Sequence, residues 1–335
     1  MRTSRFAMLF SLAVFVCLAT AAASGHDKAI VAHRGASAYL PEHTLESYAM
    51  AYGQGAHYVE PDLMLTKDGV PIALHDRTLD ATTNVAEVFP DRARDDGLFY
   101  AVDFTLAEIK QLAVIERVNR ETRELVFPDR FPNLHSALVF RVATLAEIIE
   151  LVQGLNVSTG RDVGIYPETK SSAWHAEQGF DFEQILLDVL SAYGYTTADD
   201  NVIVQSFEPD SLLRLRDLGT ELTLVQLIGG GAAYDPMVTA EGLDAVAALA
   251  DGIGPSMTRI IDGDGNWVND NFLVREAQAR GLVVHPYTMR ADRLPAYVDS
   301  FEELLELFLF EAGVDGVFTD HPDLAIRFLR ERERE

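Results

Sequence analysis

Short apolar runs recur along the chain and alternate with amphipathic segments of helical length. The apolar runs predict strands at 29–32, 58–63, 71–74, 163–166, 202–204, 222–227, 252–254, 282–284 and 316–318. Between most of them the pattern predicts helices, of which the clearest are 44–54, 144–152, 182–193, 209–218, 271–280 and 322–330. Alternation of this kind is typical of a parallel sheet covered by helices.

The connection between the second and third predicted strands is too short for a helical crossover. Thr66-Lys67-Asp68-Gly69 is a turn sequence, so these two strands are expected to pair as a hairpin, with 71–74 as an accessory strand. The remaining runs supply the strands of an α/β fold, a (β/α)8 TIM barrel. A doubly wound open sheet is the alternative.

Residues 77–140 interrupt the alternation and are rich in Asp, Arg, Phe and Pro. A segment of this length inside a compact domain is usually functional or ordered on its own. We therefore expect an insertion after the second strand region, beside the mouth of the barrel. Since no Pro, Ser or Gly tract divides the chain, residues 24–335 are expected to form one barrel domain that includes this insertion.

The first 23 residues have the pattern of a signal peptide. Arg2 and Arg5 precede an apolar stretch at 6–19, which is followed by Ala21-Ala22-Ala23 as a small-residue cleavage site. The stretch is short for a spanning helix, so no stable membrane anchor is expected, although an uncleaved anchor is the alternative. Cys17, the only cysteine, lies inside this segment. The mature product is therefore predicted to be disulfide-free and periplasmic or secreted.

The chain is strongly acidic, with a formal net charge of −25. Nucleic acids and anionic lipid surfaces carry the same sign of charge, so no nucleic-acid partner is expected. The acidity by itself identifies no substrate.

Chemically useful side chains gather where the early predicted strands end. His33-Arg34-Gly35, Glu60-Pro61-Asp62 and His75-Asp76 each follow an apolar run. In an eight-stranded α/β barrel the carboxyl ends of the strands face the active site. Cleavage of a phosphodiester requires cations to offset its charge, a group that accepts a proton and a group that donates one. These segments supply a candidate for each role.

The acidic residues in these segments form a candidate metal site. Glu60 and Asp62 lie two positions apart on one side of a strand, and Glu168 and Lys170 repeat that spacing. Carboxylate oxygens without a thiolate suit Ca²⁺ or Mg²⁺. The alternative is an ordinary solvated strand end. Pro61 has no amide hydrogen to donate to the neighbouring strand, so the strand is expected to fray there.

Either histidine alone would also fit a structural role. Two strand-end histidines beside an arginine and acidic pairs favour a functional site, because burying so much charge without function is costly. Phe207 and Tyr287, which follow later strands, are expected to line the substrate pocket, with ordinary packing as the alternative.

Together these segments resemble the glycerophosphodiester phosphodiesterase family. The matching segments, in the family's order, are His33-Arg34-Gly35-Ala36-Ser37, Pro41-Glu42-His43-Thr44, Glu60-x-Asp62, Leu65-Thr66-Lys67-Asp68-Gly69, His75-Asp76, Glu168-x-Lys170, Gln205-Ser206-Phe207 and Thr319-Asp320. Longer pieces are similar to the periplasmic bacterial branch, namely Phe89-Pro90-Asp91-Arg92-Ala93-Arg94, Gly164-Ile165-Tyr166-Pro167-Glu168 and Val284-His285-Pro286-Tyr287-Thr288. The resemblance runs from about His33 to Phe328.

The resemblance implies a role for each candidate residue. The implied metal ligands are Glu60, Asp62 and Glu168, which would hold a divalent cation, usually Ca²⁺ in this branch. The implied acid–base pair is His33 and His75, for which we expect His33 to act as base and His75 as acid. The implied phosphate-binding residues are Arg34 and Lys170.

The resemblance also implies the reaction. The substrate would be a small-molecule glycerophosphodiester such as glycerophosphocholine, and the products would be glycerol 3-phosphate and an alcohol. A homodimer is compatible with the family. The alternatives are a phospholipase D-like phosphodiesterase that acts on intact lipids, and a surface binding protein that has kept the barrel but lost activity.

Overall fold

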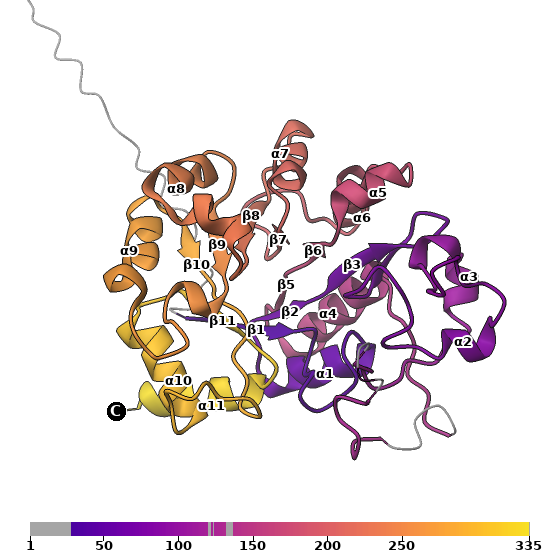
Figure 1. Ribbon diagram of the computed structural model, residues 1–335, viewed down its shortest axis with the longest axis horizontal. Coiled ribbons are helices and arrows are strands. Elements are labelled where there is room, and N and C mark those ends of the chain that lie inside the picture. The colour runs from indigo at the N-terminus through magenta and orange to yellow at the C-terminus, as the bar shows by residue number, and fades with distance from the viewer. Residues whose placement is uncertain (1–27, 120–121, 123, 132–136, 335) are drawn as a thin grey trace, which may run out of the picture.

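The structure is a computed structural model that describes residues 28–119, 122, 124–131 and 137–334 (Figure 1). The predicted signal peptide lies outside the described residues. Within the described part of the chain, no helix has both the length and the apolar character needed to cross a membrane.

Parallel strands form the centre of the fold, and helices lie around their outside (Figure 1). In chain order the parallel strands are β1 (Ala29–His33), β2 (Tyr58–Glu60), β3 (Asp62–Leu65), β5 (Gly164–Ile165), β6 (Glu168–Thr169), β7 (Ile203–Ser206), β8 (Thr223–Ile228), β9 (Gly252–Pro255), β10 (Val283–Val284) and β11 (Gly316–Thr319). Their pairings give one sheet in the order β11-β1-β2-β5 and another that runs β10-β9-β8-β7-β6-β3 and ends on β4 (Pro71–Ala73).

Backbone contacts join the two sheets at both ends. A parallel bridge between Ile165 and Val202 connects β5 to the strand that becomes β7. On the other side, the amide of Phe318 donates to the carbonyl of Pro286 at 3.0 Å, and the amide of Met289 donates to the carbonyl of Phe318 at 2.8 Å. These contacts complete a ring of parallel strands, and the predicted (β/α)8 barrel is confirmed.

Two prolines divide barrel strands that would otherwise be continuous. Pro61 separates β2 from β3, and Pro167 lies between β5 and β6. Proline has no amide hydrogen to donate to the ladder, so the strand pairing is interrupted at each position. The predicted fraying at Pro61 is wrong, however, because its carbonyl accepts from the amide of Glu168 at 2.9 Å and the strand continues as β3.

The predicted hairpin is also found. Strand β4 pairs antiparallel with β3 in a register that places Leu63 opposite Ala73 and Leu65 opposite Pro71. Gly69 adopts a φ of 76° in the turn, a conformation that glycine tolerates best. β4 is therefore an accessory strand outside the barrel ring.

The six predicted helices are found. The ends of five of them differ from the prediction by at most two residues, whereas the helix predicted at 144–152 continues to Thr159. They are α1 (Leu45–Gln54), α4 (Leu145–Thr159), α6 (Phe182–Ala192), α7 (Pro209–Asp217), α9 (Phe272–Ala279) and α11 (Pro322–Arg332). Helix α4 begins at a capping box between Thr144 and Glu147 and ends at Gly160 in the left-handed conformation. Further helices are α5 (Ser172–Glu177), α8 (Ala240–Ala247) and α10 (Phe301–Glu306). Apart from the short α5, these helices pack their apolar faces with the barrel strands into the main core.

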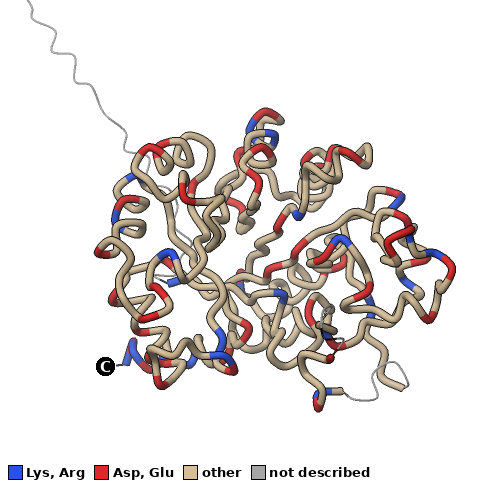
Figure 2. Tube along the Cα trace, viewed as in Figure 1, with Lys and Arg blue, Asp and Glu red and all other residues tan. Residues whose placement is uncertain are grey.

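The described part of the insertion has a small core of its own beside the β3–β4 hairpin (Figure 1). It contains the short helices α2 (Val85–Val88) and α3 (Leu106–Ile109). Buried side chains from this segment pack against Met64 and Ile72 of the hairpin. Because the hairpin continues barrel strand β3, this packing fixes the insertion next to the carboxyl ends of the strands. Figure 2 shows acidic residues on both the insertion and the barrel helices.

Candidate active site

Strand register brings the predicted site residues together at the carboxyl ends of the strands. His33 lies opposite Glu60 in the pairing of β1 with β2, and Asp62 lies opposite Glu168 in the pairing of β3 with β6. Gln205 lies opposite Glu168 on the next strand. Side chains that are far apart in the sequence therefore meet over one end of the barrel.

The three predicted metal ligands form a compact buried group. Glu60, Asp62 and Glu168 each offer an oxygen within 4.8 Å of the others, and the residues are 1, 2 and 5% exposed. Burial, together with the charge of Asp62, raises the pKa of Glu60 and of Glu168 well above the usual range. Such a group of hard oxygen donors is unfavourable unless protons or a cation offset its charge.

Asp62 remains ionised because cations surround it. Burial would raise its pKa, but Lys170 and Arg34 hold that pKa well below its usual range. Nζ of Lys170 lies 3.0 Å from Oε1 of Glu168 and 3.7 Å from Oδ1 of Asp62. Nε of Arg34 lies 3.2 Å from Oδ2 of Asp62. The two predicted phosphate-binding residues therefore lie directly beside the acidic group.

Asp62 has a further partner that sequence reasoning did not assign. Nε2 of His43 donates to Oδ2 of Asp62 at 3.0 Å, and Nδ1 of His43 lies 2.8 Å from the hydroxyl of Tyr48. Burial lowers the pKa of His43, so its imidazole is neutral and acts as a donor to the carboxylate. The Pro41-Glu42-His43 motif was the available signal for this contact.

A backbone turn after β1 also holds the acidic group. Arg34 and Gly35 have φ values of 57° and 85°, so the chain turns sharply away from the strand. The turn aims the amide of Arg34 at Oε2 of Glu60, to which it donates at 2.8 Å. A Cβ on Gly35 would overlap the side chain and backbone of Ser47 in α1, so this turn requires glycine.

Each predicted catalytic histidine is held by its own aspartate. Nδ1 of His33 lies 2.7 Å from Oδ1 of Asp320, and Nδ1 of His75 lies 3.0 Å from Oδ1 of Asp76. A carboxylate only accepts hydrogen bonds, so both imidazoles carry a proton on Nδ1 and present Nε2 for chemistry. Asp320 also lies 3.2 Å from Nε of Arg290. Thr319-Asp320 appeared among the recognised motifs, but its role as the partner of His33 was not predicted.

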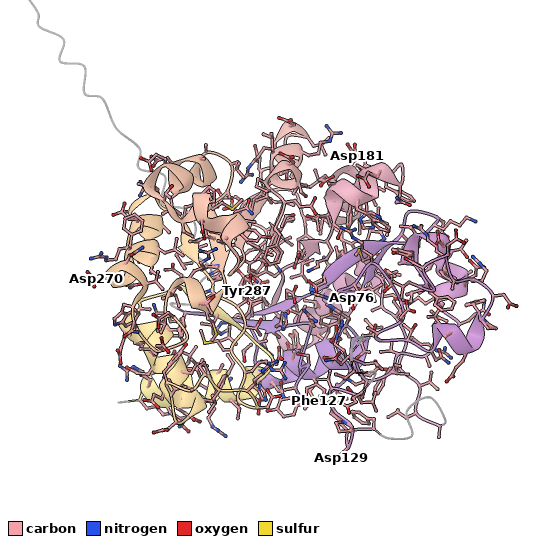
Figure 3. The ribbon with its side chains drawn as sticks, in the orientation of Figure 1. Asp76, Phe127, Asp129, Asp181, Asp270 and Tyr287 are labelled. Carbon is pink, nitrogen blue, oxygen red and sulfur yellow. The ribbon has the colours of Figure 1, made fainter. Side chains whose placement is uncertain are left out.

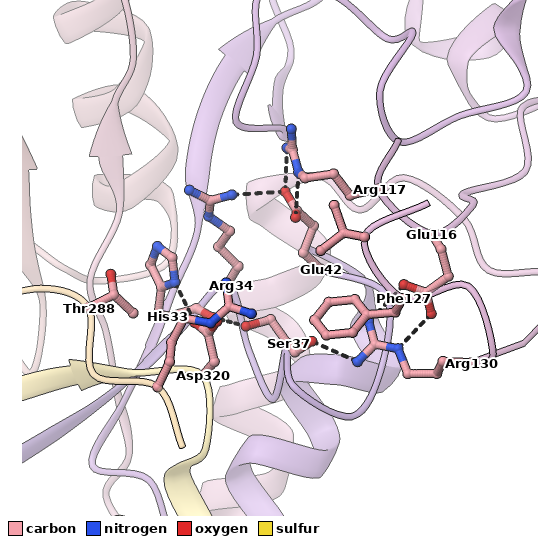
Figure 4. Close-up of a pocket in the computed structure, with 12 residues that line it drawn as sticks. His33, Arg34, Ser37, Glu42, Glu116, Arg117, Phe127, Arg130, Thr288 and Asp320 are labelled. Atoms are coloured by element: carbon pink, nitrogen blue, oxygen red, sulfur yellow. Dashed lines mark hydrogen bonds and ion pairs between the residues drawn. The ribbon is translucent and has the colours of Figure 1, made fainter. Parts of the chain in front are cut away.

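A hollow borders each histidine. A cavity of about 200 Å³ lies beside His33 and Arg34, and residues of the insertion, including Arg117 and Phe127, form its far wall (Figure 4). A more open hollow of about 340 Å³ borders His75 and Lys170, with Tyr100 of the insertion on its rim. The insertion thus contributes to both sides of the site.

The two predicted pocket aromatics lie together, on a different side of the site. The rings of Phe207 and Tyr287 meet edge to face with centroids 5.8 Å apart, and Nζ of Lys170 lies 5.5 Å from the centre of the Phe207 ring. Neither ring lines the hollow beside His33 or the hollow beside His75. Figure 3 places Asp76 and Tyr287 toward the middle of the molecule, whereas Asp181 and Asp270 lie near its rim.

Comparisons with known proteins show which proteins this chain is similar to. The profile of the Glycerophosphoryl diester phosphodiesterase family matches residues 33–324. The glycerophosphodiester phosphodiesterase of Haemophilus influenzae is 40% identical over 333 residues, with coverage of 91% of this chain and 90% of the relative. The glycerophosphodiester phosphodiesterase of Treponema pallidum is 34% identical over 344 residues, with coverage of 94% and 95%.

Solved structures share the fold. A Silicibacter pomeroyi protein assigned to the glycerophosphoryl diester phosphodiesterases has a TM-score of 0.71 at 24% identity, with coverage of 91% of this chain and 94% of that chain. An Oleispira antarctica phosphodiesterase in complex with the product sn-glycerol-3-phosphate has a TM-score of 0.63 at 23% identity, with coverage of 90% and 96%.

Proposed function

The chain belongs to the glycerophosphoryl diester phosphodiesterase family, and from this premise we propose how its site cleaves glycerophosphodiesters. The substrate is a deacylated phospholipid such as glycerophosphocholine, and the products are glycerol 3-phosphate and the alcohol. The proposal rests mainly on one observation: His33 and His75, each held by its own aspartate, are brought to the same end of the barrel as the cations Arg34 and Lys170.

In the first step, the glycerol hydroxyl beside the phosphorylated carbon attacks phosphorus. His33 accepts the proton of that hydroxyl on Nε2, while the bond from phosphorus to the leaving alcohol breaks and His75 donates a proton to the departing oxygen. A cyclic phosphate results. Water then opens the ring as the two histidines exchange roles, the attacking water losing a proton and the released glycerol oxygen gaining one. Arg34 and Lys170 offset the phosphate charge throughout.

The protonation of His75 depends on the substrate. Burial and the nearby Arg34 lower the pKa of this imidazole to about 4, so it is neutral in the free protein at pH 7. The hydrogen bond to Asp76 already opposes this lowering in the free protein. The negative charge of a bound phosphodiester would raise the pKa of His75 further, in the direction that its role as acid requires.

We further propose that Glu60, Asp62 and Glu168 hold a divalent cation. The donor set contains only hard oxygens, and Oε1 of Gln205 is buried beside it without a hydrogen-bond partner, although Nε2 of the same amide donates to Glu60 at 3.2 Å. This chemistry favours Ca²⁺, with Mg²⁺ as the alternative. A bound cation would supply positive charge to the phosphate oxygens.

The function is tested by incubating the purified protein with glycerophosphocholine and measuring release of glycerol 3-phosphate. We expect release that EDTA abolishes and that added Ca²⁺ restores better than added Mg²⁺, because Ca²⁺ accepts oxygen ligands in variable geometry whereas Mg²⁺ demands a near-ideal octahedron. Hydrolysis of vesicles of intact phospholipid or sphingomyelin instead would support the phospholipase D-like alternative. A folded, calcium-binding protein that is inert to both substrate classes would support the binding-protein alternative.

We also propose that the mature protein is exported, to the periplasm or the medium. The support is the order of basic, apolar and small residues before Ser24, with Cys17 inside the removed segment. Expression of the full chain in a bacterium with a general secretion system is expected to give an exported product whose N-terminal sequence begins at Ser24. A cytoplasmic product that retains Met1 would contradict the proposal. A homodimer stays a prediction from the family resemblance alone.

A further inference from the structure

Arg117, which belongs to the insertion, contacts two carboxylates at the rim of the site. Its Nη2 lies 2.6 Å from Oε1 of Glu42 and its Nε donates to Oε2 of the same carboxylate at 2.8 Å (Figure 4). Its Nη1 donates to Oδ2 of Asp76 at 2.8 Å. One guanidinium therefore bridges a residue of the β1–α1 loop and a residue that follows β4.

Each of these carboxylates also holds a group assigned to the reaction. The second oxygen of Asp76, Oδ1, lies 3.0 Å from Nδ1 of His75. Oε1 of Glu42 also accepts from Nη1 of Arg34 at 3.2 Å. The contacts thus run from Arg117 through Asp76 to the general acid, and from Arg117 through Glu42 to a phosphate-binding cation.

The electrostatic balance explains why this bridge is stable. Burial alone would raise the pKa of Glu42, but Arg34 and Arg117 hold that pKa well below its usual range. The pKa of Asp76 is likewise lowered, by His75 and Arg117 against the effect of burial. Both carboxylates therefore stay ionised, and each has one partner in the insertion and one in the site.

We propose that Arg117 is a positioning residue through which the insertion orients the catalytic machinery, an inference that rests on the function proposed above. By fixing Oδ2 of Asp76, Arg117 sets the rotation of that carboxylate so that Oδ1 faces Nδ1 of His75. The imidazole is then held with Nε2 toward the leaving oxygen. Through Glu42, the same guanidinium steadies Arg34.

The geometry requires arginine and not simply a positive charge. The guanidinium is planar, and three of its nitrogens are used at fixed angles to contact two carboxylates. A lysine ammonium in the same place is a point charge on a flexible stem and cannot fix the rotation of both partners. Arg117→Lys should therefore keep the local charge balance but lose the orientation.

Two esters with different leaving groups distinguish a positioning role from a merely structural one, which would slow both esters equally. His75 donates its proton to the oxygen that departs from phosphorus, and choline needs that proton because an alkoxide is a poor leaving group. p-Nitrophenolate departs without one. If Arg117 acts through Asp76 on His75, its loss must slow the choline ester more than the p-nitrophenyl ester of glycerol 3-phosphate.

The experiment measures kcat and KM on both esters for the proposed mature protein, which begins at Ser24. The variants are Arg117→Ala, Arg117→Lys, Asp76→Ala and the Arg117→Ala/Asp76→Ala double variant. We expect kcat on the choline ester to fall by roughly 10- to 100-fold in each single variant, the range typical for residues that orient a reacting group. The ratio of kcat on the choline ester to kcat on the p-nitrophenyl ester should fall in each single variant. The double variant should change that ratio no further, because both substitutions interrupt one chain of contacts.

Arg92→Lys is the matched control. Arg92 is an insertion arginine that pairs with Glu108 at 2.8 Å and with the carbonyl of Asp103 at 2.8 Å, away from both histidines. This variant should leave both kcat values within about twofold of wild type. Thermal unfolding of every variant reports whether the fold is retained, and Arg117→Lys keeps the test valid if Arg117→Ala unfolds.

The outcomes separate the two proposals. Wild-type hydrolysis of both esters combined with equal losses on both in the Arg117 and Asp76 variants would overturn the positioning role while leaving the proposed function intact. Unchanged kcat in folded Arg117→Lys would overturn it as well. A wild-type protein that hydrolyses neither ester would overturn the proposed function and this inference with it.

Discussion

Replacement of His75 by alanine is expected to lower kcat on glycerophosphocholine by about 10³-fold with little change in KM, since proton donation to the leaving oxygen occurs only in the transition state. His33→Ala should have an effect of similar size, because the attacking glycerol hydroxyl then keeps its proton. His33 ends β1 and His75 lies in the loop after β4, each beside its own aspartate, so neither imidazole can take over the position of the other.

Steady-state kinetics on the purified variants, with added Ca²⁺, checks this expectation. His57→Gln is the matched control, because His57 accepts from the amide of Ile30 at 3.0 Å near the opposite end of β1 and the glutamine oxygen can accept in its place. His75→Ala with wild-type turnover would refute the acid role. A His75→Ala protein that keeps its rate only on the p-nitrophenyl ester would instead support that role directly.

The second large effect is expected at the acidic group. Glu60→Gln and Glu168→Gln should each weaken Ca²⁺ binding by at least about tenfold, since the number of charged oxygens sets the affinity of such sites. Hydrolysis of glycerophosphocholine at low Ca²⁺ should fall by about 10²-fold, as is typical when one preorganised electrostatic contribution is removed. Glutamine keeps the size of the side chain, so the barrel should remain folded.

Binding is expected to strengthen with pH. Burial raises the pKa of Glu60 and of Glu168, so protons compete with a cation for these carboxylates. Calcium binding should therefore release protons, and affinity should fall as pH falls through these raised pKa values. Isothermal titration calorimetry in buffers of different ionisation enthalpy measures both the affinity and the number of protons released.

Asp264→Ala is the control for calcium binding. Asp262-Gly263-Asp264-Gly265-Asn266 imitates the start of an EF-hand loop, but Trp267 and Leu273 occupy positions where that loop requires glycine and glutamate. In the structure Asp262 closes this turn by accepting from the amides of Asp264 and Asn266 at 3.0 and 2.8 Å. If Asp264→Ala lost the heat of calcium binding measured by calorimetry and Glu60→Gln kept it, the ion would bind in this turn and the proposed site would be refuted.

Local sequence patterns were enough to predict an α/β fold and to place the candidate residues at strand ends. Strand–helix alternation is a local pattern of burial, and a short turn such as Thr66–Gly69 excludes a crossover, so a helix-covered parallel sheet with an accessory hairpin follows from neighbouring residues. The same pattern is compatible with a barrel and with a doubly wound open sheet. Residues at strand ends share one edge of a parallel sheet. For that reason Glu60, Asp62 and Glu168 can be grouped from the sequence, and the structure brings their carboxylate oxygens together.

The partners that hold these groups could not be read from local sequence patterns. Asp320 lies 287 positions from His33 along the chain, and Arg117 lies 75 positions from Glu42. Such contacts depend on how the ring of strands closes and on how the insertion packs against the β3–β4 hairpin. A local pattern of polar and apolar residues predicts neither of these. The division of strands at Pro61 and Pro167 is similar, because whether a strand frays or continues past a missing donor is settled by the neighbouring strand. Local periodicity fixes where a side chain emerges, whereas its partner is fixed by packing between segments that are distant in the sequence.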